Sequence, residues 1–312
     1  MSKKDKSKYQ ELKLHNSDID LNKSKKFKPV HFLNNILCMA VQESHQLIAF
    51  IDVYETIQVY NLFYGSVITA FSNKVQKDEI NSRVQKDNMY KNLYYALHFI
   101  ENSNTIVFIN SYRNEAWIYK FTDAIKLVAQ VHLPDGFAAS CSIEVKDKNT
   151  ILVGNTVGTV YMLSAKNARF FSKSFSYDNI ESQLRSLSSS IKNAQDSPIF
   201  ASYVTGKEID QDRTIIWIDV HPYVESKFAV AYAYNLVILY DFDKERIDWL
   251  YDVGSSYNSL FADKPPITLY NIPSVIKDAR YNVDSNKFLV AVDIGKIFIY
   301  KNGKSKYFLN LS

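Results

Sequence analysis

The sequence predicts an all-β protein, a β-propeller of five to seven four-stranded blades, because one pattern of short strands recurs along it. Each copy has four runs rich in apolar residues, separated by turns, and the third run ends on an aromatic or large apolar residue. The copies occupy Ile36–Phe71, Tyr94–His132, Ala139–Phe175, Ile215–Tyr251 and Val275–Asn310. Repetition of a four-strand unit at roughly 40 residues is typical of propeller blades.

The order of strand character within each copy also repeats. Apolar residues are nearly continuous in Leu47–Ile51, Thr105–Ile109 and Phe288–Val292, whereas fourth runs such as Phe170–Ser174 and Lys306–Asn310 are more polar. This gradient is expected if the inner three strands are covered on both faces and the outer strand is partly solvated. A β-sandwich, the alternative all-β fold, does not explain why the strands recur in groups of four.

The charge and the apolar pattern divide the chain into an arm and a folded body. Residues 1–28 hold nine Lys and four acids, so residues 1–30 are predicted to be a disordered basic arm. The propeller is expected over 31–312, with inserts at 72–92, 176–213 and 252–273. Only eight of the 312 residues are Gly, so Asn, Asp, Ser and Lys are expected in the turns.

One amphipathic helix is predicted inside the second of these inserts, over residues 178–194. Asp178 is placed to cap it and Glu181 stands three residues later, as in a capping box. The apolar positions recur at helical spacing, at Ile180, Leu184, Leu187 and Ile191. Such a face either packs on the side of the propeller or binds a partner protein.

Catalytic, cofactor and metal motifs are not found. Gly303-Lys304-Ser305 has Phe298 where a phosphate-binding loop needs its first glycine. His221 has no carboxylate or thiol at catalytic or ligand spacing, so a structural role is favoured for it. Acids that end or follow strands are typical of turns and are not paired as a glycosidase requires: Asp52, Asp219, Asp241 and Asp293. We therefore expect no enzymatic activity, no cofactor and no metal.

The two cysteines are predicted to be buried and reduced. Cys38 and Cys141 stand at matching places in the first runs of two copies. Free Cys behaves as a small apolar residue in such positions. No apolar run reaches the roughly 18–20 residues that span a bilayer, and the N-terminus lacks a secretory core, so the cytoplasm is the expected location.

Within the propeller class, the sequence resembles a diverged WD40 protein. Asp241 follows Tyr240 at the place where the Trp-Asp dipeptide of WD repeats stands, and Gly-His dipeptides are missing. A narrower resemblance covers Phe137–Val253, which is similar to the N-terminal propeller of the lethal-giant-larvae/tomosyn family of exocytosis regulators. The matching pieces are Ile151–Gly154, Gly158–Tyr161, Phe175–Ile180, Ile215–Pro222 and Phe228–Tyr232.

That resemblance implies two propellers side by side and binding to SNAREs and Rab-type GTPases during vesicle docking. The resulting hypothesis is a non-enzymatic cytoplasmic scaffold that regulates or tethers vesicle traffic, with peripheral membrane contact as an added feature. His221, Tyr232 and the apolar face of the helix are its candidate partner-binding residues. Contact with an anionic surface is assigned to Lys23, Lys25, Lys26 and Lys28.

An alternative hypothesis is a propeller subunit of another large assembly, in RNA metabolism or ribosome biogenesis, that uses the basic arm. Sequence-specific nucleic-acid binding is not expected, because aromatic residues do not interleave with the lysines. A third class, a propeller hydrolase, would need a pair of acids lining the central channel.

Overall fold

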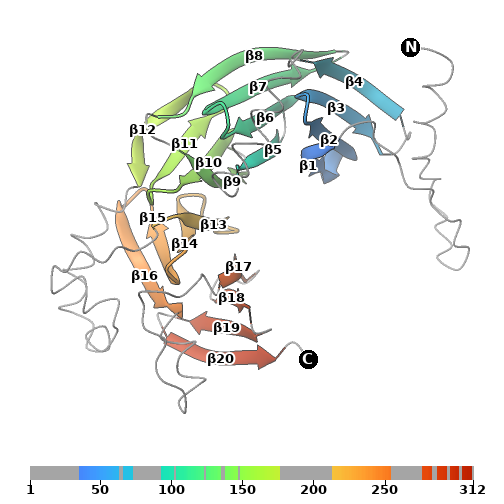
Figure 1. The fold of residues 1–312 in the computed structure, drawn as a ribbon. Coiled ribbons are helices and arrows are strands. Elements are labelled where there is room, and N and C mark those ends of the chain that lie inside the picture. Colours follow the sequence, from blue (N-terminus) through green and yellow to red (C-terminus); the bar gives the residue numbers. More distant parts are fainter. Residues whose placement is uncertain are drawn as a thin grey trace, which may run out of the picture. The chain divides into compact units, whose positions relative to one another are not determined.

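The described residues form five four-stranded antiparallel sheets. The computed structural model describes residues 35–62, 66–72, 93–101, 103–122, 124–134, 138–146, 148–175, 213–253, 276–282, 287–293, 296–301 and 304–310. Each sheet uses four consecutive strands in sequence order, so every pairing within it is between chain neighbours (Figure 1). All the resulting pairs for which a register is given are antiparallel, as successive hairpins require.

The chain divides into two compact units, which are described separately below. The first consists of Met1–Leu133 together with the turn Ala165–Arg169, and the second of Pro134–Ser164 together with Phe170–Ser312. The first unit contains two sheets. Their strands are β1 (Ile36–Gln42), β2 (Leu47–Asp52), β3 (Thr56–Asn61), β4 (Ser66–Ser72), β5 (Tyr95–Ile100), β6 (Thr105–Asn110), β7 (Glu115–Phe121) and β8 (Ile125–His132).

The second unit contains the other three sheets. Their strands are β9 (Ala139–Val145), β10 (Thr150–Asn155), β11 (Val160–Ser164), β12 (Arg169–Phe175), β13 (Ile215–Val220), β14 (Lys227–Tyr232), β15 (Leu236–Asp241), β16 (Arg246–Asp252), β17 (Ile276–Tyr281), β18 (Phe288–Val292), β19 (Lys296–Lys301) and β20 (Lys304–Asn310). The bounds of all five sheets agree with the repeats read from the sequence, so the four-strand pattern is confirmed.

In the first unit, the core lies between its two sheets, and strand β1 lies against β5. A buried polar network ties their turns together. The Glu55 side chain is fully buried, and its Oε1 accepts hydrogen bonds from Nδ2 of Asn110 and Nε of Arg113, each at 3.0 Å. A carboxylate can be buried in this way because a cation and an amide replace the water it loses.

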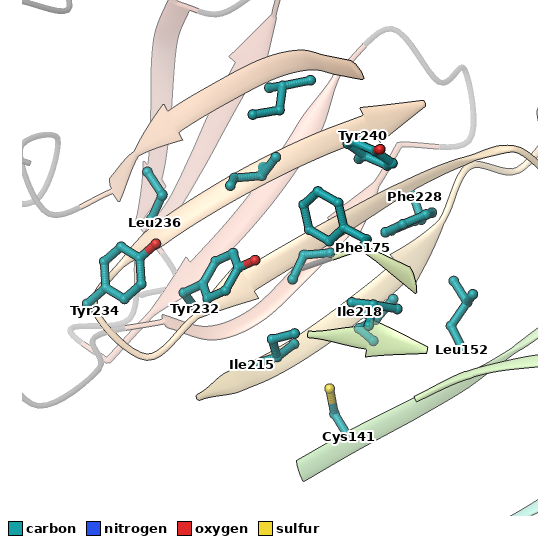
Figure 2. Packing of buried hydrophobic residues seen from close by; sticks show 14 of the residues in the cluster. Cys141, Leu152, Phe175, Ile215, Ile218, Phe228, Tyr232, Tyr234, Leu236 and Tyr240 are labelled. Carbon is teal, nitrogen blue, oxygen red and sulfur yellow. The ribbon is translucent and has the colours of Figure 1, made fainter. Parts of the chain in front are cut away.

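In the second unit, the first strand of the middle sheet lies against the first strands of both flanking sheets: β13 contacts β9 and β17. Sheets β9–β12 and β13–β16 interlock through a large aromatic core. Figure 2 shows the Phe175 ring lying against those of Phe228 and Tyr240, whose centroids are 5.9 and 4.2 Å from it. The hydroxyl of Ser140 also donates to the carbonyl of Ile215 at 2.6 Å.

A glycine permits the close approach of these two sheets. A Cβ atom added to Gly154 of β10 would lie 2.8 Å from Sγ of Cys141 and 2.9 Å from Cγ2 of Ile215. Contacts this short do not occur between real side chains, so one of the neighbours would have to move. Gly154 lies inside strand β10, where the lack of a side chain is what matters.

The tight turns agree only in part with the expectation of Asn, Asp, Ser and Lys, because the described non-Gly residues with a left-handed backbone include Gln, Glu and Ala besides Asn. Residues other than Gly take a left-handed backbone at Gln46, Glu55, Asn114, Asn149, Ala168, Asn235 and Glu245. Oδ1 of Asp52 accepts the backbone N–H groups of Tyr54 and Thr56, and Oδ1 of Asn155 accepts those of Val157 and Thr159. These side chains replace part of the backbone bonding of the turn, which confirms the prediction for Asp52.

Burial differs from the expectation at the first strand of the first sheet. Strands β6, β10 and β15 are buried along their whole length, as predicted for inner strands. Strand β1, by contrast, alternates, with Met39 65 % and Val41 52 % exposed. The first strand is an edge of its sheet, so it has a neighbouring strand on one side only and less of its surface is covered.

Several predictions fall outside the described residues. These are the basic arm at 1–30 and the helix at 178–194, together with most of the inserts at 72–92, 176–213 and 252–273. Within the described part of the chain, a short 3-10 turn, Glu43–His45, joins β1 to β2.

Candidate protein-interaction site

A groove opens in the second unit between sheets β9–β12 and β13–β16. Its volume is about 450 Å³. We call it the intersheet groove. Ten side chains line it: Lys148, Thr150, Leu152, Met162, Phe171, Glu225, Ser226, Phe228, Phe242 and Asp243. A concave site of this size is within the range of sites that hold small ligands or single anchoring side chains of a partner.

Strand alternation sets the apolar part of the groove. Thr150 and Leu152 stand two residues apart on β10, so they face the same side, and Met162 pairs with Leu152 from β11. Phe228 begins the opposite wall on β14 and packs against Phe242 at a centroid distance of 6.4 Å. The groove therefore continues the apolar core between the two sheets outward to the surface.

The mouth of the groove is charged. Nζ of Lys148 lies 3.0 Å from Oε2 of Glu225, and both side chains are almost half exposed. Asp243 is exposed in the turn between β15 and β16, and no cation pairs with it within the described residues. The mouth thus has one compensated ion pair and one carboxylate open to solvent.

The buried acid next to the groove has its own cations. Asp241 is 2 % exposed, and its Oδ2 lies 3.2 Å from Nζ of Lys244 and 3.8 Å from Nζ of Lys227. Burial by itself raises the pKa of this carboxyl, but hydrogen bonds from Lys244 and the charges of both lysines outweigh burial and hold the pKa below its ordinary value. Asp241 therefore fixes the turn that carries Phe242 and Asp243.

His221 shapes the loop that supplies Glu225 and Ser226 to the groove. Its Nδ1 accepts the backbone N–H groups of Tyr223 and Val224, at 3.2 and 3.0 Å. Burial, and then the charge of Lys227, lowers the pKa of His221, which favours the neutral ring that these two bonds require. The loop exposes Tyr223 at 68 %. His221 thus has the structural position expected from the sequence, on a loop that borders the groove.

The other predicted partner-binding residues lie elsewhere. Tyr232 is fully buried, and its hydroxyl donates to the carbonyl of Gly158 at 3.4 Å, so it links two sheets in the interior (Figure 2). The helix residues lie outside the described part of the chain, as do the four lysines of the arm: Ile180, Leu184, Leu187, Ile191, Lys23, Lys25, Lys26 and Lys28.

A cluster between β13 and β17 was missed by the sequence reasoning. Nε of Arg280 lies 3.0 Å from Oδ1 of Asp278, and its Nη1 lies 3.7 Å from Oδ1 of Asp219. The guanidinium also lies over the Trp217 ring, 4.5 Å from its centroid. Spacing of two residues places Trp217 beside Asp219, and Asp278 beside Arg280, on one face of a strand. That spacing was the available signal.

This cluster brings two acids together, yet their arrangement is that of a clamp. Oδ2 of Asp219 accepts the backbone N–H of Tyr281 at 2.7 Å, and Arg280 lies between the two carboxylates. Burial raises the pKa of Asp219, opposed by the Tyr281 bond and the Arg280 charge. Asp219 holds β17 against β13, and Asp278 is paired with Arg280 within β17, an arrangement that does not leave one as a free acid and the other as a nucleophile.

Among the described residues, His, Cys, Asp and Glu do not gather in groups that could hold a metal ion. Nor does that part of the chain contain a helix of the length and apolarity needed to cross a membrane.

Comparison with known proteins establishes the fold and leaves the family open. No family model matches the sequence, and no curated protein matches it. Among solved structures, the crystal structure of the C-terminal WD40 domain of Sif2 matches with a TM-score of 0.50 and 13 % identity. The match covers 85 % of this chain and 55 % of that chain, so this chain spans about half of its length.

In all, 1544 chains of solved structures match. Because the architecture is shared so widely, the likeness indicates a fold and does not identify a partner. Together with the five four-stranded sheets, it confirms the predicted class: a WD40-like β-propeller fold. The fold does not by itself define a function, which depends on the site that the fold carries. The resemblance to the lethal-giant-larvae/tomosyn family stays a prediction.

Proposed function

We propose that the protein is a non-enzymatic interaction scaffold and that the intersheet groove is where it holds a partner. One observation carries this proposal: an apolar groove with a charged mouth lies between two rigid sheets. Side chains fixed by sheet packing lose little freedom when a partner binds, which favours affinity. We therefore expect the groove to bind another protein.

The process we propose is vesicle traffic, in the cytoplasm and at membrane surfaces. Its support is the sequence resemblance of Phe137–Val253 to exocytosis regulators, a stretch that includes all ten residues of the groove. The proposed partners are SNAREs, small GTPases or tethering subunits. Lys23, Lys25, Lys26 and Lys28 would add contact with anionic lipid, at about 1 kcal/mol for each charge close to the surface.

The test is affinity purification of the full chain from cytosol and from detergent-solubilised membranes, with the bound proteins identified by mass spectrometry. Recovery of a SNARE, a small GTPase or a tethering subunit is expected. A Phe171→Asp variant, altered at the groove, should lose that partner, whereas Trp249→Asp, altered at an exposed aromatic residue of β16 outside the groove, should keep it. Repeated purification without any of these partner classes would contradict the proposal.

A second candidate is a subunit of an RNA-containing assembly, favoured by the nine lysines among residues 1–28. Deletion of residues 1–30 distinguishes the two candidates. Loss of RNA from the purified complex would support the second, and loss of membrane association would support the first.

A further inference from the structure

We infer that the intersheet groove recognises a short segment of another protein in which a bulky apolar residue is followed at once by Arg or Lys. This inference rests on the proposed scaffold function and adds the chemistry of the segment. The apolar side chain enters the groove, and the cation lies at its mouth beside the carboxylate of Asp243.

The interior of the groove selects an apolar group. Met162, Phe171 and Phe242 contribute accessible sulfur or aromatic surface, and the almost fully buried Leu152 and Phe228 lie behind them. The hydroxyls of Thr150 and Ser226 are the main polar groups of the interior. Phe228 is held on three sides, with ring centroids 5.9 Å from Phe175, 5.6 Å from Tyr240 and 6.4 Å from Phe242. This wall is therefore rigid and preformed.

The opposite wall can adjust to the shape of what enters. Met162 is half-buried on β11, and an unbranched thioether can take several rotamers at low cost. Phe171, 38 % exposed on β12, offers apolar surface at the rim. The groove should accordingly accept Leu, Met or Phe at similar affinity and refuse a charged or small side chain.

The mouth selects the charge of the neighbouring residue. Lys148 and Glu225 compensate one another, and the nearby Lys227 and Lys244 are taken up by Asp241 and Asp248. Asp243 is left as the carboxylate open to a partner within the described residues. Arg246 shares Asp248 with Lys227. The open carboxylate of Asp243 beside an apolar groove attracts a cation and repels an acid.

The test uses purified full-length protein and short fluorescein-labelled Gly-Ser peptides that carry Leu-Arg, Leu-Glu or Ser-Arg at their centre. Fluorescence anisotropy measures the dissociation constant of each. The Leu-Arg peptide should bind more tightly than Leu-Glu by roughly threefold to tenfold, the range for a solvent-exposed charge pair and its reversal. The Ser-Arg peptide should not bind measurably, because it leaves the groove empty.

A charge exchange on the protein makes the assignment specific. Asp243 is exposed in a turn, so Asp243→Lys is expected to fold, and it should reverse the order of Leu-Arg and Leu-Glu. Asp293→Lys places the same change on an exposed turn residue outside the groove and should leave the order unchanged. Circular dichroism and thermal melting establish that both variants are folded.

Other outcomes would overturn the inference. Equal binding of all three peptides, or an order that Asp243→Lys does not change, would show that the groove does not read this pair. Self-association that disappears in Asp243→Lys would show that its occupant is a second copy of the chain. If the peptides fail while the partners of the full chain are still captured, the scaffold proposal stands and the groove assignment falls. If the peptides bind in the expected order but no traffic partner is recovered, the groove assignment stands and the proposed role in vesicle traffic falls.

Discussion

Lys148 and Glu225 form an ion pair of 3.0 Å that joins the β9–β10 loop to the β13–β14 loop across the mouth of the groove. Both partners are almost half exposed, so the pair is screened by water and salt. Glu225→Gln is therefore expected to lower the free energy of unfolding by less than about 1 kcal/mol. In 1 M salt, where the screening length is about 3 Å, urea titrations of the variant and of the unaltered protein should give the same free energy of unfolding. A larger loss that persists in salt would contradict this account.

The carboxylate of Glu55 should be far more sensitive. It is fully buried against Asn110 and Arg113, and Glu55→Gln removes the negative charge that compensates the Arg113 guanidinium. We expect Glu55→Gln to cost about 3 kcal/mol of unfolding free energy, the range for breaking a buried pair. Glu43→Gln, at an exposed acid in the β1–β2 turn, is the matched control and should be nearly neutral. Equal losses for the two variants would refute the role of the network.

The close approach at Gly154 gives a third prediction. Its added Cβ would meet Sγ of Cys141 and the side chain of Ile215, so Gly154→Ala should destabilise the protein by about 1–3 kcal/mol through overpacking. Cys141→Ala removes the nearest atom and should recover part of that loss in the double variant. Additive effects of the two substitutions, measured by denaturant unfolding, would show that these atoms do not collide.

Left-handed turns give a prediction of opposite sign. Ala168 has φ of 50° in the turn between β11 and β12, a conformation that costs about 1 kcal/mol for a residue with a Cβ. Ala168→Gly should therefore raise the melting temperature or leave it unchanged. Ala165→Gly, in the same turn but without a positive φ, should lower it. A lower melting temperature for Ala168→Gly would mean that its side-chain contacts outweigh the strain.

Stability should fall in mild acid because of His98. Burial lowers the pKa of His98 from 6.5 to about 4, so the unfolded chain takes up a proton that the folded chain refuses. The contribution is fully present above pH 6.5 and is lost as the pH falls toward 4, with a slope of at most about 1.4 kcal/mol per pH unit. His98→Gln should flatten the pH profile of unfolding over this range. Identical pH profiles for His98→Gln and the unaltered protein would contradict this account.

The cysteines provide an independent measure of packing. Burial raises the pKa of both Cys38 and Cys141 to about 12, which suppresses the reactive thiolate at neutral pH. Labelling with iodoacetamide should therefore be slow and should accelerate when denaturant opens the sheets. Rapid labelling of Cys141 in the native protein would contradict the burial described here.

The sheets could be predicted from the sequence because their causes are local. Apolar runs, turn residues and hairpins between chain neighbours are all properties of a few consecutive residues, and their repetition gave the fold class. The position of Tyr232 was also available: alternation places it with Phe228 and Val230, both of which face the core. Its assignment to partner binding came from the resemblance alone.

The groove could not be predicted, and the two-residue spacing in β13 and β17 did not show that the two parts of the clamp meet, because each depends on which sheets lie side by side. Leu152 and Phe228 are 76 positions apart in the sequence, and only the packing of two sheets brings them to one groove. Trp217 and Arg280 likewise meet between sheets. Glu55 is a different case, since Glu rarely takes a left-handed backbone and nothing in its neighbourhood marks a buried acid.

Each sheet is made from one uninterrupted stretch of chain, and this has a consequence for how the protein is made. Pairing between neighbours in sequence closes only short loops, so a sheet can assemble as soon as its fourth strand leaves the ribosome. The sheets can then form one after another, in the order in which they are translated. Insertions between two such stretches should also be tolerated during evolution, because they interrupt the strand pairing of neither sheet.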